Sequence, residues 1–221
     1  YSKIKVWYNG LYYFLGEMRY MDELSLFNES LIFIEAAIVE LRSGLEIVKK
    51  CLEREKGRSC IETVKSRVKT GESISAKLKS RGLPVTAASA LEHLYDIAGV
   101  RVICSYIDDV YSVAEMMRKR RDIEIIEEKD YIKNPKPNGY RSYHMILRVP
   151  IYVSDETYVV NAELQIRTIA MDCWASLEHA MKYKKDIKSP ELIANELKRC
   201  ADDIASVDIN MQTIRDMISE Q

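Results

Sequence analysis

Polar side chains that could carry chemistry alternate along the segment NAELQIRT, which begins at residue 161. Glu163, Gln165 and Arg167 are spaced two residues apart, so they project from one face if the segment is a β-strand. The residues between them are apolar and predict a buried reverse side. A glutamate at the centre of such a row could be a general base or a Mg²⁺ ligand. The alternative is the exposed face of an edge strand without a chemical role.

A second carboxylate, Asp96, comes just before the apolar run 97–104, and Arg101 interrupts this run with a charge. Mg²⁺ typically takes one or two protein carboxylates together with substrate phosphate oxygens, so Asp96 and Glu163 could share one ion. A regular strand would place Asp96 and Arg101 on opposite faces, unless the chain bends at Gly99. An equally good alternative makes Arg101 the ion-pair partner of an acid at the edge of the core, and Asp96 a simple turn residue.

The segment 65–81 contains six Lys or Arg residues and one Glu. If it is helical, Lys69, Ser73 and Lys77 share one face, because they are four residues apart. A hydroxyl and two ammonium groups suit a triphosphate, and a turn at Gly71 before a helix adds backbone N–H donors for anions. The segment lacks the GxxxxGK[ST] pattern of a P-loop. A solvated basic helix is the simpler alternative for this segment taken alone.

The segment 129–142 predicts a loop, because it contains two prolines and an Asn-Gly pair. Cations bind phosphates, an aromatic ring can stack on a base, and prolines stiffen the backbone. The segment therefore predicts a nucleotide clamp, with a solvent-exposed turn as the alternative. His144, just beyond it, could donate to a phosphate or be a satisfied histidine of a strand. The loop and its C-terminal flank contain the cations and tyrosines Lys129, Lys133, Lys136, Arg141, Tyr131, Tyr140 and Tyr143.

The elements that must position these groups follow from the periodicity of the apolar residues. Residues 1–55 are predicted to be helical, a mixed core of strands and helices follows, and helices close the chain. Thr86 and Asp108 are the expected N-caps of two core helices. The predicted strands are 61–69, 97–104, 122–127, 143–153 and 157–167, and the predicted helices of the core and C-terminus are 72–79, 86–94, 108–120, 168–184 and 190–221, the last as one helix or two. This order is typical of an α+β fold with a mixed sheet of about five strands.

Composition narrows the class of protein. The formal net charge of −1 argues against a general polyanion binder, so any interest in phosphates must come from local patches. Five scattered cysteines without a CxxC pair are typical of reduced thiols in the cytoplasm. The apolar stretch 31–39 contains Glu35 and is too short to span a bilayer. We therefore expect a cytoplasmic protein without a membrane partner.

In order along the chain, SRVKTGESISAK, YDIAGVRV, KNPKPNGYRSYH and AELQIRT, followed by WASLEHAMKYK, resemble the synthetase domain of the RelA/SpoT homologue family. The resemblance covers about residues 60–185, and the short chain with helical ends looks like a small alarmone synthetase. It implies a nucleotidyltransferase-like mixed sheet. It also implies an enzyme of the stringent response that transfers pyrophosphate from ATP to the 3′-hydroxyl of GDP or GTP, with GMP as a further candidate acceptor, and releases AMP.

The resemblance also implies roles for single residues. The ATP phosphates and the adenine side would be held by Arg67, Lys69, Ser73 and Lys77, and adenine would stack on Arg101. Guanine would stack on Tyr140 with help from Asn138, and the phosphates of the acceptor would meet Lys129, Lys136 and His144. The Mg²⁺ ligands would be Asp96 and Glu163, with Glu163 also the catalytic base, and the metal and phosphate end would be supported by Gln165 and Arg167.

Further expectations concern the whole protein. Similar enzymes form homotetramers to which the terminal helices contribute, so a homotetramer is expected, and nucleic acid is not an expected substrate. The division is a helical arm at 1–55, a catalytic core at 56–185 and a helical extension at 186–221. Hydrolysis of the product is not expected, because the three histidines form no His-Asp pair. Three rivals are an enzyme that moves a nucleotidyl group, a non-catalytic nucleotide- or RNA-binding module, and a helical scaffold protein. A pure anion binder would gain nothing from two carboxylates, and a scaffold would leave the NGYRSYH loop unexplained.

Overall fold

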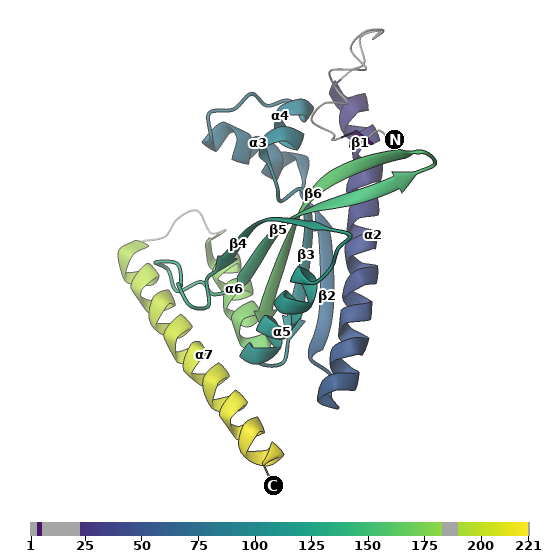
Figure 1. The fold of residues 1–221 in the computed structure, drawn as a ribbon. Coiled ribbons are helices and arrows are strands. Elements are labelled where there is room, and N and C mark those ends of the chain that lie inside the picture. The colour runs from purple at the N-terminus through teal and green to yellow at the C-terminus, as the bar shows by residue number, and fades with distance from the viewer. Residues whose placement is uncertain (1–3, 6–22, 183–189, 221) are drawn as a thin grey trace.

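A computed structural model describes residues 4–5, 23–182 and 190–220 of the chain (Figure 1). The described residues form a six-stranded mixed sheet. Five strands follow the order β2 (Ile61–Val68), β3 (Ala98–Cys104), β6 (Glu156–Thr168), β5 (Tyr143–Val153) and β4 (Glu124–Asp130), and β1 (Ile4–Lys5) pairs with β6 off this path. Neighbours in the five-strand order are antiparallel except β3 and β6, which are parallel. The α+β fold with a mixed sheet is thus confirmed.

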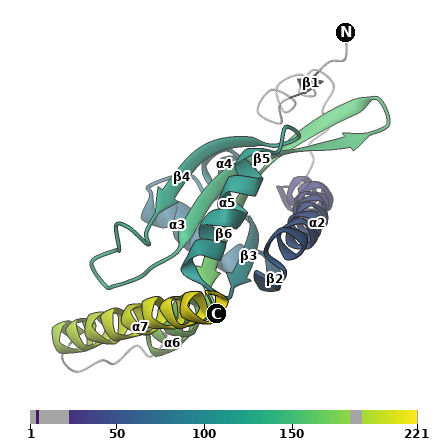
Figure 2. The same cartoon turned by 60° about the horizontal axis from the view of Figure 1, so that its bottom comes forward.

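One face of this sheet is buried under two helices, α2 (Glu23–Lys56) and α5 (Ile107–Arg118), which also contact each other (Figures 1 and 2). The buried residues of α2 recur at helical spacing, as in Ile34, Leu41, Leu45 and Leu52. They share the main core with Leu164 and the other apolar residues of β6. Since side chains alternate along a strand, the polar residues of β6 lie on the opposite face.

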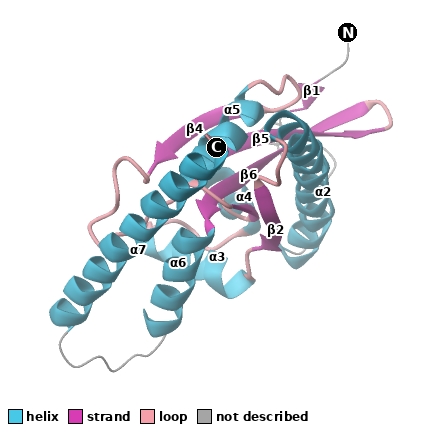
Figure 3. Ribbon diagram, turned by 90° about the horizontal axis from the view of Figure 1, so that it is seen from below, coloured by secondary structure: helices cyan, strands magenta, loops and turns pink. Residues whose placement is uncertain are grey.

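Four more helices are described. They are α3 (Gly71–Ser80), α4 (Ala87–His93), α6 (Ile169–Lys182) and α7 (Pro190–Ser219). The side chains of Thr70 and Thr86 accept hydrogen bonds from backbone N–H groups in the first turns of α3 and α4, which confirms Thr86 as an N-cap. The single helix α7 runs alongside α6, and its C-terminal part reaches α5 (Figures 2 and 3).

Some sequence-based boundaries were wrong. The expected loop at 129–142 begins two residues later, because β4 continues through Lys129 and Asp130 in register with β5. Asp108 is not the N-cap of α5. It lies in the first turn of this helix, where the positive end of the helix dipole stabilises a carboxylate. Ile4 and Lys5 form a strand beside β6 rather than a helix. The other residues before Glu23 lie outside the described residues.

No helix of the described part of the chain is both long enough and apolar enough to cross a membrane.

Candidate active site

The polar face of the sheet carries a row of side chains contributed by all five strands of the main path. In register across β2, β3, β6, β5 and β4, the row contains Lys65, Arg101, Gln165, His144 and Lys129. Residues in register on neighbouring strands share a face, so five distant segments meet here. Glu163 is two residues from Gln165 and therefore lies on the same face, in register with Gly99 on β3 and Ile146 on β5.

Glu163 belongs to a closed cycle of five side chains. His144 Nδ1 is 3.0 Å from Glu163 Oε1, and Gln165 Nε2 donates to Glu163 Oε2 over 2.9 Å. Arg167 Nη2 donates to Gln165 Oε1 over 2.8 Å and to the Tyr140 hydroxyl over 2.5 Å. The Tyr140 hydroxyl lies 2.8 Å from His144 Nε2 and closes the cycle.

One assignment of protons satisfies every link of this cycle. Arg167 is a donor only, so the Tyr140 oxygen accepts from it and donates its own proton to His144 Nε2. His144 must then carry its proton on Nδ1 and donate it to Glu163. Burial lowers the pKa of His144 below its ordinary value, although Glu163 opposes this shift, which agrees with a neutral imidazole at pH 7.

The cycle keeps Glu163 ionised and its orientation defined. Burial alone would raise the pKa of Glu163, but the hydrogen bonds from His144 and Gln165 outweigh burial and hold this pKa below its usual value. Each carboxylate oxygen accepts one bond from the cycle and has lone-pair capacity left for a further partner. The arrangement is that of a carboxylate that can accept a proton or bind a cation.

Asp96 lies between two lysines at the other end of this face. Its Oδ2 accepts from Lys69 Nζ over 2.6 Å and from Lys77 Nζ over 2.7 Å. Burial would raise the pKa of Asp96, but the two ammonium groups outweigh it and lower the pKa. Asp96 Oδ1 is buried and has no hydrogen-bond partner among the described residues. The charge of Asp96 opposes the lowering of the Glu163 pKa, but the hydrogen bonds from His144 and Gln165 prevail.

The basic segment 65–81 contains the end of β2 and the helix α3, as predicted, so Lys69, Ser73 and Lys77 do not share one helical face. Lys69 lies before α3 rather than in it, because Thr70 is the N-cap. The ammonium groups of Lys69 and Lys77 nevertheless meet at Asp96. Ser73, in the first turn of α3, accepts a hydrogen bond from the Thr70 hydroxyl over 2.9 Å and is exposed.

Arg101 lies on the same face as Glu163, since it is in register with Gln165. The predicted alternation between Asp96 and Arg101 fails because β3 begins only at Ala98, after Asp96. Arg67 is in register with Gly99, and a Cβ added at Gly99 would lie 3.6 Å from Arg67 Cγ. Gly99 thus leaves the Arg67 stem lying across β3, beside Arg101.

The loop between β4 and β5 lies against α6 and α7. Gly139 has φ +88°, which favours glycine, and an added Cβ there would lie 2.5 Å from Ala201 Cβ. Arg141 Nη1 donates to the Ala201 carbonyl over 3.1 Å, and Asn138 Nδ2 donates to Glu178 Oε1 over 3.1 Å. Asn138, expected at guanine, therefore also anchors the loop to α6.

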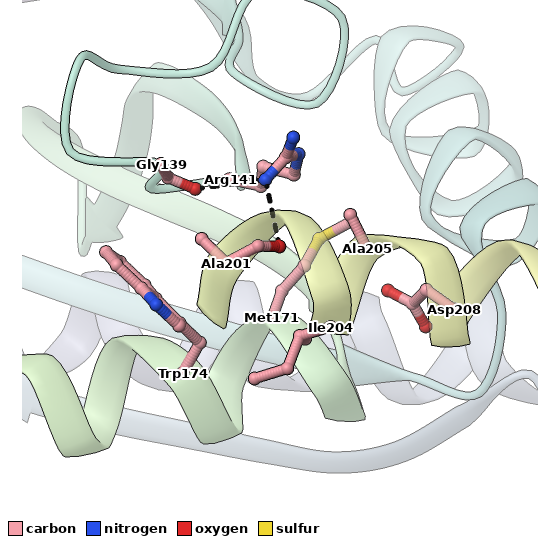
Figure 4. A pocket seen from close by; sticks show the side chains of 8 residues that line it. All are labelled: Gly139, Arg141, Met171, Trp174, Ala201, Ile204, Ala205 and Asp208. Atoms are coloured by element: carbon pink, nitrogen blue, oxygen red, sulfur yellow. Dashed lines mark hydrogen bonds between the residues drawn. The ribbon is translucent and has the colours of Figure 1, made fainter. Parts of the chain in front are cut away.

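Figure 4 shows a small pocket behind this loop, between α6 and α7. Trp174, Ile204 and Ala201 give it an apolar lining, and none of its lining residues belongs to the Glu163 cycle. The pocket therefore lies where the loop packs against α6 and α7, and it is not part of the polar face.

Two lysines expected at the acceptor phosphates, Lys136 in the loop and Lys129 on β4, differ in their surroundings. The Lys136 ammonium lies 4.6 Å from the ring centre of Tyr131 and 4.8 Å from that of Tyr140, which are cation–π distances. Lys129 Nζ is 2.8 Å from Glu127 Oε2. The hydrogen bond that Lys129 donates to Glu127 and, more weakly, the charge of Glu163 raise the pKa of Lys129.

Three side chains that hold the site were not recognised as site residues from the sequence. Asp172 pairs with Arg101 and Arg167, Ser142 Oγ accepts from Arg167 Nε over 3.3 Å, and Glu178 holds Asn138. Arg101 and Asp172 are 71 residues apart, so no local spacing could have linked them.

Comparison with known proteins identifies the family of this chain. Residues 66–188 match the model described as a region found in RelA / SpoT proteins. The GTP pyrophosphokinase YwaC of Bacillus subtilis is 41% identical over 200 residues, covering 89% of this chain and 95% of the relative. The GTP pyrophosphokinase YjbM of the same organism is 37% identical over 185 residues, covering 83% and 86%.

Solved structures agree with this result. The crystal structure of small alarmone synthetase 1 from Bacillus subtilis bound to its product pppGpp has a TM-score of 0.78 at 34% identity and covers 86% of this chain and 97% of that one. Small alarmone synthetase 2 from the same organism has a TM-score of 0.76 at 41% identity, covering 86% and 98%. The chain therefore belongs to the RelA/SpoT family and is similar along most of its length to that family's small GTP pyrophosphokinases.

Proposed function

We propose that the protein transfers a pyrophosphate group from ATP to the 3′-hydroxyl of GDP or GTP, so that (p)ppGpp and AMP are formed. The observation that carries this proposal is the ionised Glu163 carboxylate, held by His144 and Gln165 on a polar face lined with cations. Family membership supports the same activity, since relatives that match most of the chain are GTP pyrophosphokinases.

In the reaction that we propose, Glu163 accepts the proton of the 3′-hydroxyl. The oxygen attacks the β-phosphorus of ATP, the bond between the β-phosphorus and the α,β-bridging oxygen breaks, and AMP leaves with that oxygen. Such transfers depend mainly on in-line positioning and on neutralising the charge that spreads over the phosphoryl oxygens. The hydrogen bonds within the cycle supply the positioning of the base.

For the donor nucleotide we propose the side of the face formed by β2, β3 and α3. Lys69, Lys77 and Ser73 would contact its phosphates, and Arg67 and Arg101 would lie against adenine. The two lysines already share a carboxylate, and Arg67 lies beside Arg101 across Gly99, which supports a site for an anion next to a flat ring.

For the acceptor we propose the side formed by β4, β5 and their loop. Tyr140 would stack on guanine near Asn138, while Lys129, Lys136 and His144 would contact phosphates. The loop is held by α6 and α7, and the cations beside Tyr140 support this assignment. Gln165 and Arg167 would support Glu163, because Gln165 donates to Glu163 and Arg167 donates to Gln165.

For the metal we propose Mg²⁺ between Asp96 and Glu163. The buried Oδ1 of Asp96, which has no hydrogen-bond partner in the described part of the chain, fits this role, since a buried carboxylate oxygen without a partner is costly. No group of three or more His, Cys, Asp or Glu side chains suited to a metal occurs in the described residues. Two carboxylates suffice for Mg²⁺, because the substrate phosphates complete its coordination. When bound, the ion would neutralise charge on the transferred group.

Incubation of the purified protein with ATP, Mg²⁺ and each of GMP, GDP and GTP, followed by anion-exchange chromatography, tests this function. We expect AMP and a 3′-pyrophosphorylated guanine nucleotide in equal amounts. Release of free pyrophosphate with a nucleotidylated product would indicate nucleotidyl transfer instead. Absence of any product with all three acceptors would leave only nucleotide binding.

Replacement of Tyr140 by Ala is expected to weaken binding of GDP by about 1–3 kcal/mol, which is typical for loss of a stacked base. Tyr140→Phe is the matched control, because it keeps the ring and removes only the hydroxyl that contacts His144 and Arg167. Calorimetric titration with GDP should give an affinity close to that of the wild type for Tyr140→Phe. Equal affinities for Tyr140→Ala and the wild type would rule out stacking.

We further propose a homotetramer built from second copies of this chain. Val207, Met211, Ile214 and Ile218 are at least half exposed and follow each other at steps of four, three and four along α7. Such a stripe is typical of a helix that packs against another helix. The three-part division proposed at 1–55, 56–185 and 186–221 places this stripe in the C-terminal extension.

The variant Ile214→Glu is expected to lower the molar mass of the assembly, because it places a charge in the stripe. Light scattering coupled to size-exclusion chromatography measures this mass, and the chain alone weighs 25.6 kDa. Thr213→Glu serves as the control, since Thr213 is exposed on the same helix and lies on a face away from the stripe. A wild-type protein that elutes as a monomer would contradict the proposal.

We propose the cytoplasm as the location, where ATP and guanine nucleotides are abundant. The five cysteines, all within the described residues, are free thiols, as expected in a reducing compartment.

A further inference from the structure

The carboxylate of Asp172, in the first turn of α6, joins two arginines from different strands. Its Oδ1 accepts from Arg101 Nη1 over 3.1 Å and from Arg167 Nη1 over 3.2 Å. Its Oδ2 lies 3.7 Å from Lys65 Nζ. The Asp172 side chain is only 13% exposed, so these contacts are partly shielded from water. One carboxylate thus serves three cations of the polar face.

The charge of Asp172 compensates a repulsion between the two arginines. Burial and then the charge of Arg167 lower the pKa of Arg101, while Asp172 raises it. Arg101 Nε is buried and has no hydrogen-bond partner among the described residues, so the hydrogen bond from its Nη1 to Asp172 orients its guanidinium. A partly buried cation that loses its counter-charge is costly, and Arg101 would move toward water.

The two arginines face different halves of the site. Arg167 is 4% exposed and is fixed by the cycle around Glu163, through Gln165 and Tyr140, and by Ser142. Arg101 instead lies beside Arg67, on the side that we assign to the donor nucleotide. Asp172 therefore connects the rigid acceptor half to the arginine of the donor half.

We propose that Asp172 is a positioning residue. Its contact with Arg167 fixes the Asp172 carboxylate, and this carboxylate holds Arg101 in the orientation that receives the adenine of ATP. The inference rests on the proposed function for the assignment of Arg101 to the donor site. It adds that the fixed side chains of the acceptor half orient Arg101 in the donor half through the Asp172 carboxylate.

The test is a double-mutant cycle read out by calorimetric binding of α,β-methylene-ATP to the full chain. Asp172→Asn keeps the size of the side chain but removes its charge, and it should weaken binding of this analogue roughly fivefold, about 1 kcal/mol of coupling. In the Arg101→Ala background the same substitution should change the affinity less than about twofold, because its effect passes through Arg101.

Affinity for GDP gives a second readout that a general loss of structure would not spare. Arg167 keeps its bonds to Ser142, Gln165 and Tyr140 in Asp172→Asn, so the dissociation constant of GDP should change less than about twofold. Asp172→Glu restores the charge one methylene further out and should bind the ATP analogue more tightly than Asp172→Asn does. Thermal unfolding shows whether each variant is folded. If Asp172→Asn is not, Asp172→Glu is compared directly with the wild type and should bind the ATP analogue within about twofold of it, and a roughly fivefold loss would contradict the proposal.

The outcomes separate the two proposals. If Arg101→Ala binds the ATP analogue as tightly as the wild type, the donor assignment in the proposed function is wrong. If Arg101→Ala binds weakly while Asp172→Asn binds normally, the role of Asp172 is wrong and the donor assignment stands. The role of Asp172 is also wrong if Asp172→Asn weakens binding of the ATP analogue equally with and without Arg101. It is wrong as well if Asp172→Glu binds the analogue as weakly as Asp172→Asn.

Discussion

Glu163→Gln is expected to lower kcat by at least ~10²-fold, the low end of the contribution of a general base. The amide has nearly the same size as the carboxylate, but it cannot accept the proton of the 3′-hydroxyl and carries no charge for a cation. The substitution also turns one acceptor of the cycle into a donor, which then faces either the donor His144 Nδ1 or the donor Gln165 Nε2. Initial rates of AMP release at saturating ATP and GDP measure the effect.

Glu124→Gln is the matched control for this substitution. Glu124 lies on β4, is exposed and pairs only loosely with Arg148 at 3.3 Å, so its loss should leave kcat unchanged. Thermal unfolding and GDP binding should show that Glu163→Gln is folded and still takes up the acceptor. Synthesis at a near-normal rate by Glu163→Gln would show that another group accepts the proton.

Asp96→Asn is expected to raise the Mg²⁺ concentration needed for half-maximal rate by at least ~10-fold, the lower range for a residue that supports a bound metal. The substitution removes one of two carboxylates and converts an oxygen shared by Lys69 and Lys77 into a neutral partner. It also leaves two ammonium groups without a counter-charge, which repel an incoming cation. Initial rates over a Mg²⁺ titration at fixed ATP and GDP provide the measurement.

Glu72→Gln is the control for Asp96, because Glu72 is an exposed acid in the first turn of the neighbouring helix α3. Its Mg²⁺ dependence should match that of the wild type. If Asp96→Asn required no more Mg²⁺ than the wild type, Asp96 would serve only as the counter-charge of the two lysines, and the metal would have to be held elsewhere.

The carboxylate strand shows how far local pattern reasoning reaches. The alternation of Glu163, Gln165 and Arg167 with apolar residues predicted one polar and one buried face of a strand, and β6 has both. That alternation is a property of the backbone itself, so it can be read without knowledge of the neighbours. Asp96 marks the limit, since the alternation was extended across a residue that lies before its strand begins.

The apolar and polar pattern of the chain, the N-cap Thr86 and the ordered motifs thus determined the α+β class, the positions of most elements and the family. These signals are local, or they depend only on the order of segments. The tertiary structure alone decided that Tyr140, His144 and Arg167 close a hydrogen-bonded cycle with Glu163, and that Asp172 joins Arg101 to Arg167. Strand order and register set these contacts, and a sequence does not state which distant strands become neighbours.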